Sequence, residues 1–341
     1  LKALDEDVRK AGLTFLNEVG LDPGIDHMSA LRIIHAIEER GGKVVSFRSY
    51  CGALPAPEAD TNPWGYKFSW SPRGVVLAGR NSARYLEDGE EKTLPGERLF
   101  SRHWLVDVKG FGEFEAYYNR DSIPYIGTYG LGAVRDMYRA TLRYPGWSYT
   151  MQKLADLGYF GLEDLEGPPA TYAALAAALA QVPEDGGLAG RVAGVLDVDP
   201  ASDTMRRMTW LGLFVDEPVP WDDLPTRSPL DALASRMLPM MPLEEGDRDL
   251  CVMQHEITGE YPSGTRELVT STLVAYGEPA GDSAIARTVG LPAAIAAGMV
   301  LDGRVAERGV LIPVAPAVYA PILDELASSA GMVFNERTRV I

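Results

Sequence analysis

Cysteine, histidine and long apolar runs are all scarce in this chain of 341 residues. The two cysteines, Cys51 and Cys251, are too few for a disulfide framework, so we expect a reduced, cytoplasmic setting. The four histidines show no paired ligand spacing and the cysteines lie far apart, which predicts no metal site. No apolar run reaches the roughly 18 residues of a membrane span and no signal peptide opens the chain, so we expect no membrane partner.

Positive charge is also in short supply. The chain has 32 Lys and Arg against 48 Asp and Glu, which gives a net charge of −16. This charge argues against nucleic acid and anionic membranes as partners. It also repels an anionic substrate at long range, so a site for such a substrate must gather arginines locally. The hydrophobic content of 46% is ordinary for a globular protein with a sizeable core.

The dinucleotide-binding pattern Gly-x-Gly-x-x-Gly is missing as well. Near misses occur at 110–112 and 130–132, but each lacks the third glycine. Neither follows a clear strand and opens a helix, as the motif requires. Nucleotide binding therefore has to be inferred from other features of the chain.

The most informative stretch that is present is the turn at 20–28, Gly-Leu-Asp-Pro-Gly-Ile-Asp-His-Met. The apolar run Leu13–Val19 before it predicts a strand, and the apolar spacing after it predicts a helix over Met28–Arg40. Glycine and proline break the chain between the two, and Asp26 stands at the expected N-cap. In an open α/β sheet, ligands collect beside turns of this kind.

Asp22, Asp26 and His27 in this turn are candidate proton-transfer groups, because carboxylates and histidine can be tuned toward neutral pH. Lys67 and Tyr66 are further candidates. A purely capping role for Asp26, a structural role for His27 and a turn with no chemistry all stay open. The catalytic group is therefore left unassigned.

Apolar periodicity divides the rest of the chain into strands and helices. Strands are predicted at 43–52, 105–108, 114–118, 138–144, 249–258, 267–276 and 332–337. Helices are predicted at 1–11, 74–86, 151–157, 171–181, 200–214, 228–238, 283–301 (interrupted at Gly290 and Pro292) and 316–329. The result is an α/β (α+β) fold in which a helical stretch interrupts the strands.

A series of segments, taken in order, resembles saccharopine reductase, the glutamate-forming saccharopine dehydrogenase family. The segments are the turn at 20–28 and then 49–58, 65–71, 119–122, 141–144 and 288–292. The resemblance covers nearly the whole chain and thins between about 158 and 247. An ordered set of this length is much more specific than any single motif.

The resemblance implies a mixed-sheet substrate and dimerisation domain with an inserted helical subdomain. The implied divisions are 1–19 (end of a Rossmann domain), 20–145 (first part of the substrate-binding domain), 146–240 (helical insert), 241–308 (second part of the substrate-binding domain) and 309–341 (return to the Rossmann domain). Most of that Rossmann domain is missing, and the chain opens with Leu1 in mid-pattern, so we expect a piece of a longer protein. A homodimer is implied too.

The implied reaction joins glutamate and 2-aminoadipate 6-semialdehyde into an imine, which NAD(P)H reduces to saccharopine; the reverse direction releases glutamate. The choice between NAD and NADP stays open, because the second Rossmann strand that decides it is absent. The missing N-terminal domain would bind most of the cofactor. The chain alone is expected to be inactive, since it lacks the phosphate-binding turn.

The resemblance also assigns site residues. Arg120 and the segment Thr141, Leu142 and Arg143 are implied to contact saccharopine. A guanidinium suits this role because it binds a carboxylate through two parallel hydrogen bonds at any physiological pH. Without the resemblance, two surface or ion-paired arginines would be the plainer interpretation.

The nucleotide contacts implied by the resemblance are Gly20, Leu21 and Asp22 in the turn, together with Ser69. Glycine at such a position lets the backbone approach a ligand closely.

Two alternatives remain open. One is a related imine reductase of the same fold, such as carboxynorspermidine dehydrogenase, which has fewer carboxylates to hold. The other is a non-catalytic binding or dimerisation module. The presence of both Arg120 and Arg143 favours saccharopine.

Overall fold

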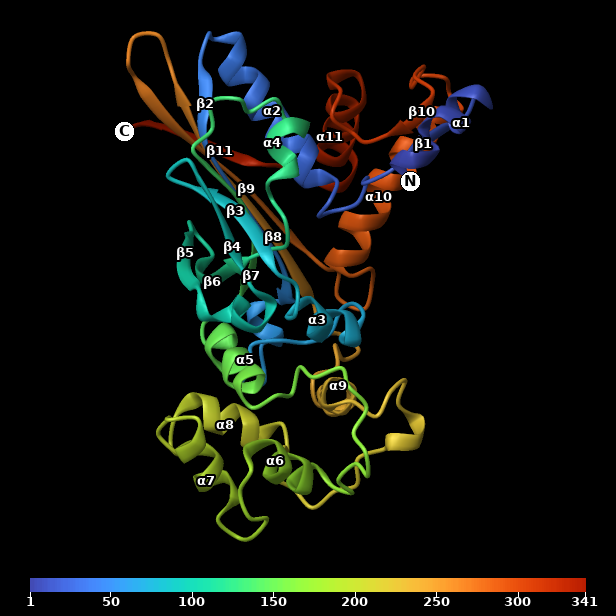
Figure 1. Ribbon diagram of the computed structural model, residues 1–341. Helices are drawn as coiled ribbons and strands as arrows, with labels where there is room; N and C mark the ends of the chain where they lie inside the picture. Colours follow the sequence, from blue (N-terminus) through green and yellow to red (C-terminus); the bar gives the residue numbers. More distant parts are fainter.

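A nine-stranded mixed sheet forms the centre of the protein (Figure 1). The computed structural model describes residues 1–341 except for the side chain of Pro72. The strands are β1 (Thr14–Leu16), β2 (Lys43–Pro55), β3 (Ala83–Glu87), β4 (Glu90–Leu94), β5 (His103–Val108), β6 (Gly112–Tyr118), β7 (Asp136–Arg143), β8 (Asp249–Glu260), β9 (Arg266–Tyr276), β10 (Gly309–Leu311) and β11 (Asn335–Val340). The main sheet runs in the order β11-β9-β8-β2-β7-β3-β4, and the β5–β6 hairpin also pairs with β7. The α/β fold class predicted from the sequence is confirmed.

The helices lie beside the sheet and at one end of it. They are α1 (Asp5–Lys10), α2 (Ile25–Glu39), α3 (Pro72–Ala78), α4 (Pro124–Thr128), α5 (Trp147–Asp156), α6 (Tyr172–Ala180), α7 (Leu188–Val195), α8 (Asp203–Trp210), α9 (Pro229–Met240), α10 (Ala284–Leu301) and α11 (Pro316–Ala330). Short 3-10 turns are η1 (Lys2–Leu4), η2 (Pro57–Ala59), η3 (Gly96–Ser101) and η4 (Trp221–Asp223). Helices α2, α10 and α11 pack together against one face of the sheet (Figure 1).

Strand β2 is the axis of the sheet. It pairs with β7 in parallel and with β8 antiparallel. Because successive side chains of a strand alternate between faces, Phe47 and Cys51 pack toward α2, while Tyr50 and Leu54 join the core on the opposite face. Both faces of β2 are therefore buried over much of its length.

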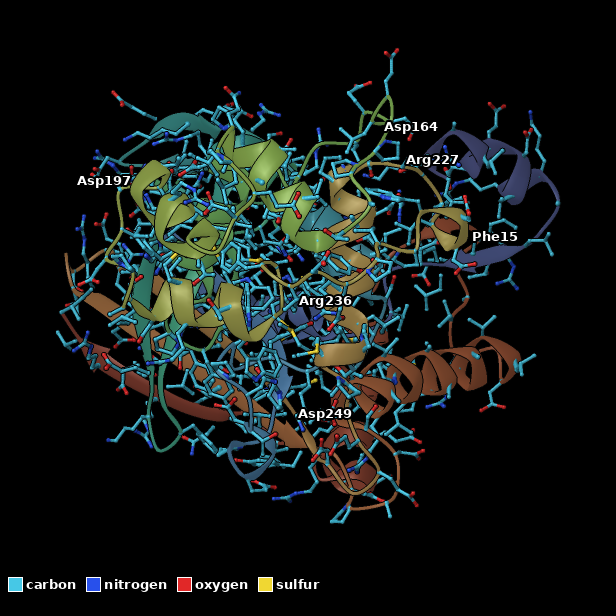
Figure 2. All side chains as sticks on the ribbon, turned by 90° about the horizontal axis from the view of Figure 1, so that it is seen from below. Phe15, Asp164, Asp197, Arg227, Arg236 and Asp249 are labelled. Carbon is cyan, nitrogen blue, oxygen red and sulfur yellow. The ribbon has the colours of Figure 1, made fainter. Side chains whose placement is uncertain are left out.

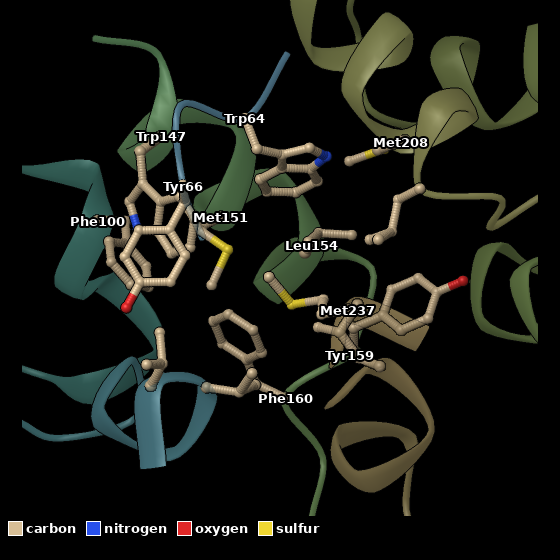
Figure 3. Close-up of a cluster of buried hydrophobic side chains, with 14 of the residues drawn as sticks. Trp64, Tyr66, Phe100, Trp147, Met151, Leu154, Tyr159, Phe160, Met208 and Met237 are labelled. Carbon is tan, nitrogen blue, oxygen red and sulfur yellow. The ribbon is translucent and has the colours of Figure 1, made fainter. Parts of the chain in front are cut away.

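Helices α5 to α9 form a helical subdomain at the lower end of the sheet (Figure 1). Its core combines leucine and alanine with aromatic and methionine side chains, and it extends to the loop after β2. Figure 3 shows this contact, where Trp64 of the loop lies between Trp147 of α5 and Met208 of α8. The Trp64 indole N–H also donates to the Arg207 carbonyl at 3.0 Å, which ties the loop to α8.

A second sheet has only two strands, β1 and β10, which pair in parallel at the end where the chain begins (Figure 1). It lies at the periphery, where the Phe15 side chain is 39% exposed (Figure 2). The segment 309–341, expected to return to the Rossmann domain, contributes a strand to each sheet. Its first strand joins β1, but β11 adds to the edge of the main sheet beside β9.

Helix α10 is continuous, so the interruption predicted at Gly290 and Pro292 is wrong. The helix packs on β8 and α11, with Pro292 buried, and this tertiary packing outweighs the local cost of proline and glycine. By length and composition alone, α10 could cross a membrane: its mean hydropathy is 1.7 and 28% of it is buried. Helix composition of this kind is also found in the cores of globular proteins.

The predicted helix at 74–86 is also wrong in its second half. Helix α3 ends at Ala78, and β3 begins at Ala83. The reason is pairing across the sheet: β3 lies between β4 and β7, with Ala83 and Tyr85 buried in alternation. The short elements α4, β4 and α7 were not predicted.

The start of α10 depends on a buried carboxylate. Asp249, at the start of β8, is 1% exposed. Its two oxygens accept the N–H groups of Ala284 at 2.5 Å and Ile285 at 2.9 Å. These are donors that a helix leaves unpaired at its N-terminus, and negative charge is favourable there.

We therefore expect Asp249→Ala to lower the free energy of unfolding by about 1–3 kcal/mol, because two buried N–H groups lose their acceptor. Urea unfolding would measure the change. Ser283→Ala is the control: Ser283 caps the same helix through the Ala286 N–H, and its loss should cost only about 1 kcal/mol. An Asp249 variant no less stable than the Ser283 variant would contradict this account of the helix start.

Candidate functional site

The site is built on one face of β7. Arg139, Thr141 and Arg143 alternate along this strand, so their side chains share a face. Arg139 and Arg143 are buried and Thr141 is half-buried. Leu142 points the other way, into the core. Of the substrate residues expected from the sequence, Thr141 and Arg143 are thus brought together, while Leu142 could offer only its backbone.

Neighbouring strands add to the same face. In the register of the sheet, Cys51 of β2 lies beside Thr141, and so does Tyr117 of β6. Burial raises the pKa of the Cys51 thiol well above its ordinary value, so this group is a neutral thiol. The centre of the face is therefore uncharged, between an arginine on either side.

The turn at 20–28 approaches the face at Arg139. The Arg139 Nη2 lies within ion-pair distance of the Asp22 carboxylate and 3.1 Å from Asp26 Oδ2. Its Nη1 donates to the Tyr125 hydroxyl at 2.8 Å, and the guanidinium lies over the Tyr125 ring at 4.6 Å. Arg139 was missed in the sequence; its alternation with Thr141 and Arg143 was the signal that could have found it.

The turn itself is tightly closed. The Gly20 carbonyl accepts the Ile25 N–H at 2.8 Å. Gly24 has φ 148°, and a Cβ there would come within 2.1 Å of the Gly20 carbonyl oxygen, so only glycine fits. The predicted N-cap at Asp26 is wrong: Gly24 is the N-cap, and Asp26 lies in the first turn of α2. The Asp26 carboxylate is turned back to accept the Gly24 N–H at 2.5 Å.

His27 is fully buried and has partners on both sides. Its Nε2 lies 2.8 Å from Glu18 Oε2 and its Nδ1 lies 2.7 Å from the Tyr129 hydroxyl. Burial lowers the pKa of His27, against the effect of Glu18. The ring links the segment after β1 to α4, and its nitrogens have no free position for a substrate proton.

The charges around the turn do not balance. Two carboxylates, of Asp22 and Asp26, lie within ion-pair distance of the Arg139 guanidinium, and a third, of Glu18, is paired with His27 nearby. Burial raises the pKa of Asp26 to about 7, and the charge on Glu18 adds to the shift. Burial likewise lowers the pKa of Arg139 to about 10. Asp26 therefore retains a proton up to about neutral pH.

Arg143, unlike Arg139, has aromatic rings rather than carboxylates in contact with its guanidinium. Its Nη1 donates to the Leu142 carbonyl at 2.7 Å, and its guanidinium carbon lies 5.0 Å from the Tyr66 ring centre and 5.5 Å from that of Trp147. Among the side chains that the structure describes, no carboxylate comes within 4.0 Å of it, and its Nε has no hydrogen-bond partner. A buried guanidinium without a counter-charge is costly, so this one is poised for an anionic ligand.

Arg120 lies beyond the end of β6, exposed, with φ 53°. Since Glu115 of β6 is opposite Arg143, the two arginines are five residues apart along the strand pair, a Cα separation of at most roughly 17 Å at about 3.4 Å per residue. They can hold two different carboxylates of one elongated molecule.

The remaining site residues expected from the sequence do not belong to the row on β7. Lys67 is 5% exposed and its Nζ lies 2.5 Å from Asp247, so this candidate for proton transfer is held in an ion pair. Ser69 is half-buried, and its hydroxyl has no partner among the described side chains. Gly20 and Leu21 belong to the turn beside Arg139, and Leu21 is buried.

The raised pKa of Asp26 gives a testable pH dependence. Its folded-state pKa of about 7 lies above the unfolded value of about 3.9. The folded protein thus holds a proton that the unfolded chain releases, so this contribution to stability is present at low pH and is lost as the pH rises to 7. Asp26→Asn removes it, and wild type should lose up to about 1.4 kcal/mol per pH unit relative to the variant between pH 5 and 7.

Urea unfolding of both proteins at pH 5, 6, 7 and 8 would measure this difference. His27 also contributes to the pH dependence of stability, with a sign opposite to that of Asp26, because its pKa is lowered in the folded protein. This contribution is present in both proteins, so it cancels in the difference between them. Parallel curves for wild type and Asp26→Asn across this range would show that Asp26 is already ionised at pH 5.

Comparison with known proteins identifies the family of the chain. A family model described as the saccharopine dehydrogenase C-terminal domain matches residues 20–332. The NADP(+)-dependent, L-glutamate-forming saccharopine dehydrogenase of Saccharomyces cerevisiae is 39% identical, over 99% of this chain and 76% of its own length. The protein of the same description from Pyricularia oryzae is 37% identical, over 98% of this chain and 76% of its own length.

More distant and structural relatives give the same result. The mitochondrial alpha-aminoadipic semialdehyde synthase of Mus musculus is 36% identical over the whole of this chain, which spans 37% of that protein. A solved structure of apo saccharopine dehydrogenase (L-Glu forming) from Saccharomyces cerevisiae matches with a TM-score of 0.90 at 37% identity, covering 99% of this chain and 77% of that one. The family model, the related sequences and the solved structure agree that the chain belongs to the saccharopine dehydrogenase family.

Proposed function

We propose that this chain is the substrate-binding part of an NADP-dependent saccharopine dehydrogenase of the L-glutamate-forming type, an oxidoreductase of lysine metabolism. The observation that carries the proposal is Arg143, a buried guanidinium that forms no ion pair with any carboxylate of the described residues. The relatives that bear this name cover nearly all of the chain. The enzyme interconverts saccharopine with glutamate and 2-aminoadipate 6-semialdehyde.

In the reductive direction, the glutamate amine adds to the aldehyde and water leaves, which forms an imine. Hydride added to the imine carbon and a proton added to the nitrogen give saccharopine. The cofactor supplies the hydride. The protein has to orient the imine and keep a proton within reach, which are effects of position and electrostatics.

The face of β7 suits these tasks. Arg143 would hold one carboxylate of the substrate and Arg120 another at the far end, with Thr141 and the neutral Cys51 thiol between them. Asp26, beside Arg139, keeps a proton near neutral pH at the other end of the row. Two separated arginines favour a substrate with several carboxylates over one with few, as in carboxynorspermidine.

We also propose that NADP is held mainly by a nucleotide-binding domain N-terminal to these residues, with contacts from Gly20, Leu21, Asp22 and Ser69. The residues present fit this role. The glycine turn lets backbone approach a ligand, and the buried Ser69 hydroxyl lacks a partner within the described part of the chain. The net charge of −16 and two free, buried cysteines support a cytoplasmic enzyme without nucleic-acid or membrane partners.

A lysine at position 143 tests the central assignment in the enzyme that includes its nucleotide-binding domain. Arg143→Lys keeps the charge but loses the second parallel hydrogen bond. We expect saccharopine use to weaken by about 1.5–3 kcal/mol, or roughly ten- to hundred-fold in kcat/KM, with little change in the KM for NADP.

Arg206→Lys is the control, since Arg206 is 63% exposed in a surface pair with Asp203. It should change kcat/KM by no more than about 0.5 kcal/mol. An unaltered kcat/KM in Arg143→Lys, or an effect confined to NADP, would remove the support for this function.

A homodimer formed through the main sheet is a further part of the proposal. The face opposite α2 bears an open groove of about 870 Å³ between the β5–β6 hairpin and β11. Apolar side chains lie exposed along it: Leu105 at 55%, Phe111 at 44% and Val333 at 63%. Strand β11 is exposed along its whole length and pairs on one side only. An exposed edge and apolar patch of this kind are typical of an interface.

Sedimentation should therefore find a dimer at tens of micromolar, the range expected of roughly 1,600 Å² of buried surface. The double variant Leu105→Glu, Val333→Glu should be monomeric, because it places two charges in the contact. Leu162→Glu is a matched control on the helical subdomain, where Leu162 is 42% exposed, and should remain a dimer. A wild-type monomer, or a double variant that still dimerises, would exclude this face.

A further inference from the structure

Glu115 lies directly opposite Arg143 in the antiparallel pair of β6 and β7. Opposed residues project from the same face, with Cβ atoms about 4.5–5.5 Å apart. Both side chains are buried, Glu115 at 4% and Arg143 at 5% exposure. An ion pair between them would be the ordinary outcome. The described residues contain none, because the two groups do not come within 4.0 Å.

The Glu115 carboxylate is directed to the start of α5 instead. Its Oε2 accepts the Gly146 N–H at 2.9 Å, and its Oε1 accepts the Ser148 N–H at 2.6 Å. Between these two residues lies Trp147, the first residue of α5. Both oxygens are thus used by backbone donors that a helix leaves unpaired at its N-terminus.

The opposite side of this helix start is fixed by a buried arginine. Arg207 of α8 donates to the carbonyls of Pro63 at 2.7 Å and Pro145 at 3.1 Å. Its guanidinium lies against Gly146, where a Cβ would meet it at 2.5 Å. Gly146 has φ 93°, which also favours glycine. The first turn of α5 is therefore held between the Glu115 carboxylate and the Arg207 guanidinium.

This helix start provides one wall of the Arg143 site. The Trp147 ring lies 4.8 Å from the Tyr66 ring (Figure 3). The Arg143 guanidinium carbon lies 5.5 Å from the Trp147 ring centre and 5.0 Å from that of Tyr66. Flat ring faces restrict a guanidinium to its plane and leave its N–H edge available. The position of Trp147 thus decides which way the donors of Arg143 point.

The charge on Glu115 also matters. It lies next to Arg143 and partly compensates a buried positive charge, but the helix N-terminus occupies its oxygens. The Glu115 carboxylate therefore partly offsets the positive charge of Arg143 without forming an ion pair with it. The hydrogen-bonding edge of Arg143 stays open to a ligand. If Glu115 were released from α5, its carboxylate would be free to pair with Arg143 and to occupy the edge that a ligand needs.

We propose that Glu115 is a positioning residue of the carboxylate site, which keeps Arg143 open for a substrate carboxylate by binding the N-terminus of α5. The proposal rests on the assignment of Arg143 to substrate binding. It makes two separable statements: the capping bonds set Trp147, and the negative charge weakens the attraction of Arg143 for an anion. Two substitutions at position 115 separate them.

Glu115→Ala removes both the bonds and the charge. In the enzyme with its nucleotide-binding domain, the KM for saccharopine should rise at least tenfold, with kcat within twofold and the KM for NADP unchanged.

Glu115→Gln retains a carbonyl oxygen for the Ser148 N–H but loses the charge. Its KM for saccharopine should fall about threefold below wild type, although the protein unfolds at a lower temperature.

Asp249→Ala is the matched control, because Asp249 is also a buried carboxylate at a helix start, that of α10, away from Arg143. It should lower the unfolding temperature with the KM for saccharopine unchanged. Protection against thermal unfolding by saccharopine gives a second readout that needs no turnover: stronger than wild type in Glu115→Gln and weaker in Glu115→Ala.

The proposal is overturned if Glu115→Ala loses stability like Asp249→Ala but keeps its KM within twofold. It is also overturned if Glu115→Gln fails to bind saccharopine more tightly, a result that decides the matter even where the alanine variant does not fold. Arg143→Lys, measured alongside, separates the two levels. If Arg143→Lys is impaired and the Glu115 variants are normal, only the proposed role of Glu115 is refuted. If Arg143→Lys is normal, the assignment of Arg143 to substrate binding is refuted as well.

Discussion

The contrast between two buried arginines on one strand is the constraint on which the rest of the site depends. Arg139 and Arg143 are four residues apart on the same face of β7 and are equally buried, yet one is surrounded by carboxylates and the other has none in contact. A buried charge needs compensation. At Arg139 the protein supplies it by direct ion pairs. At Arg143 it supplies ring faces and a carboxylate held at a distance, and no carboxylate of the described residues forms an ion pair with the guanidinium.

The topology of the sheet explains how these two environments can lie so close together. Strand β7 pairs in parallel with β2 and antiparallel with β6, so segments from distant parts of the chain meet at its two ends. The turn before α2 reaches Arg139, while the start of α5, immediately after β7, reaches Arg143. The helical subdomain then secures α5 through Arg207. A subdomain that looks separate in Figure 1 is thus part of the support of the site.

Much of this arrangement could be predicted, and what could not has a common cause. The alternating strand β2, the apolar strand β8 and the turn at 20–28 were found, because their signal is local. The continuity of α10, the change from helix to strand at Ala83 and the pairing of Arg139 were not, because each is decided by contacts between distant segments. Asp26 is instructive, since its sequence position suits an N-cap while its burial beside Arg139 gives it another partner.

Because the net charge of the protein is −16, the burial of these arginines matters for the binding of any anion. A molecule with several carboxylates is repelled by such a protein at long range, but salt screens that repulsion beyond about 8–10 Å. Inside the site the dielectric is lower, so a single unpaired guanidinium has a stronger effect on a nearby carboxylate than many surface charges have at a distance. Selectivity for an anion can therefore coexist with an acidic surface, provided that the cation is buried and that no carboxylate of the protein reaches it first. Directing Glu115 to the start of α5 meets that second condition.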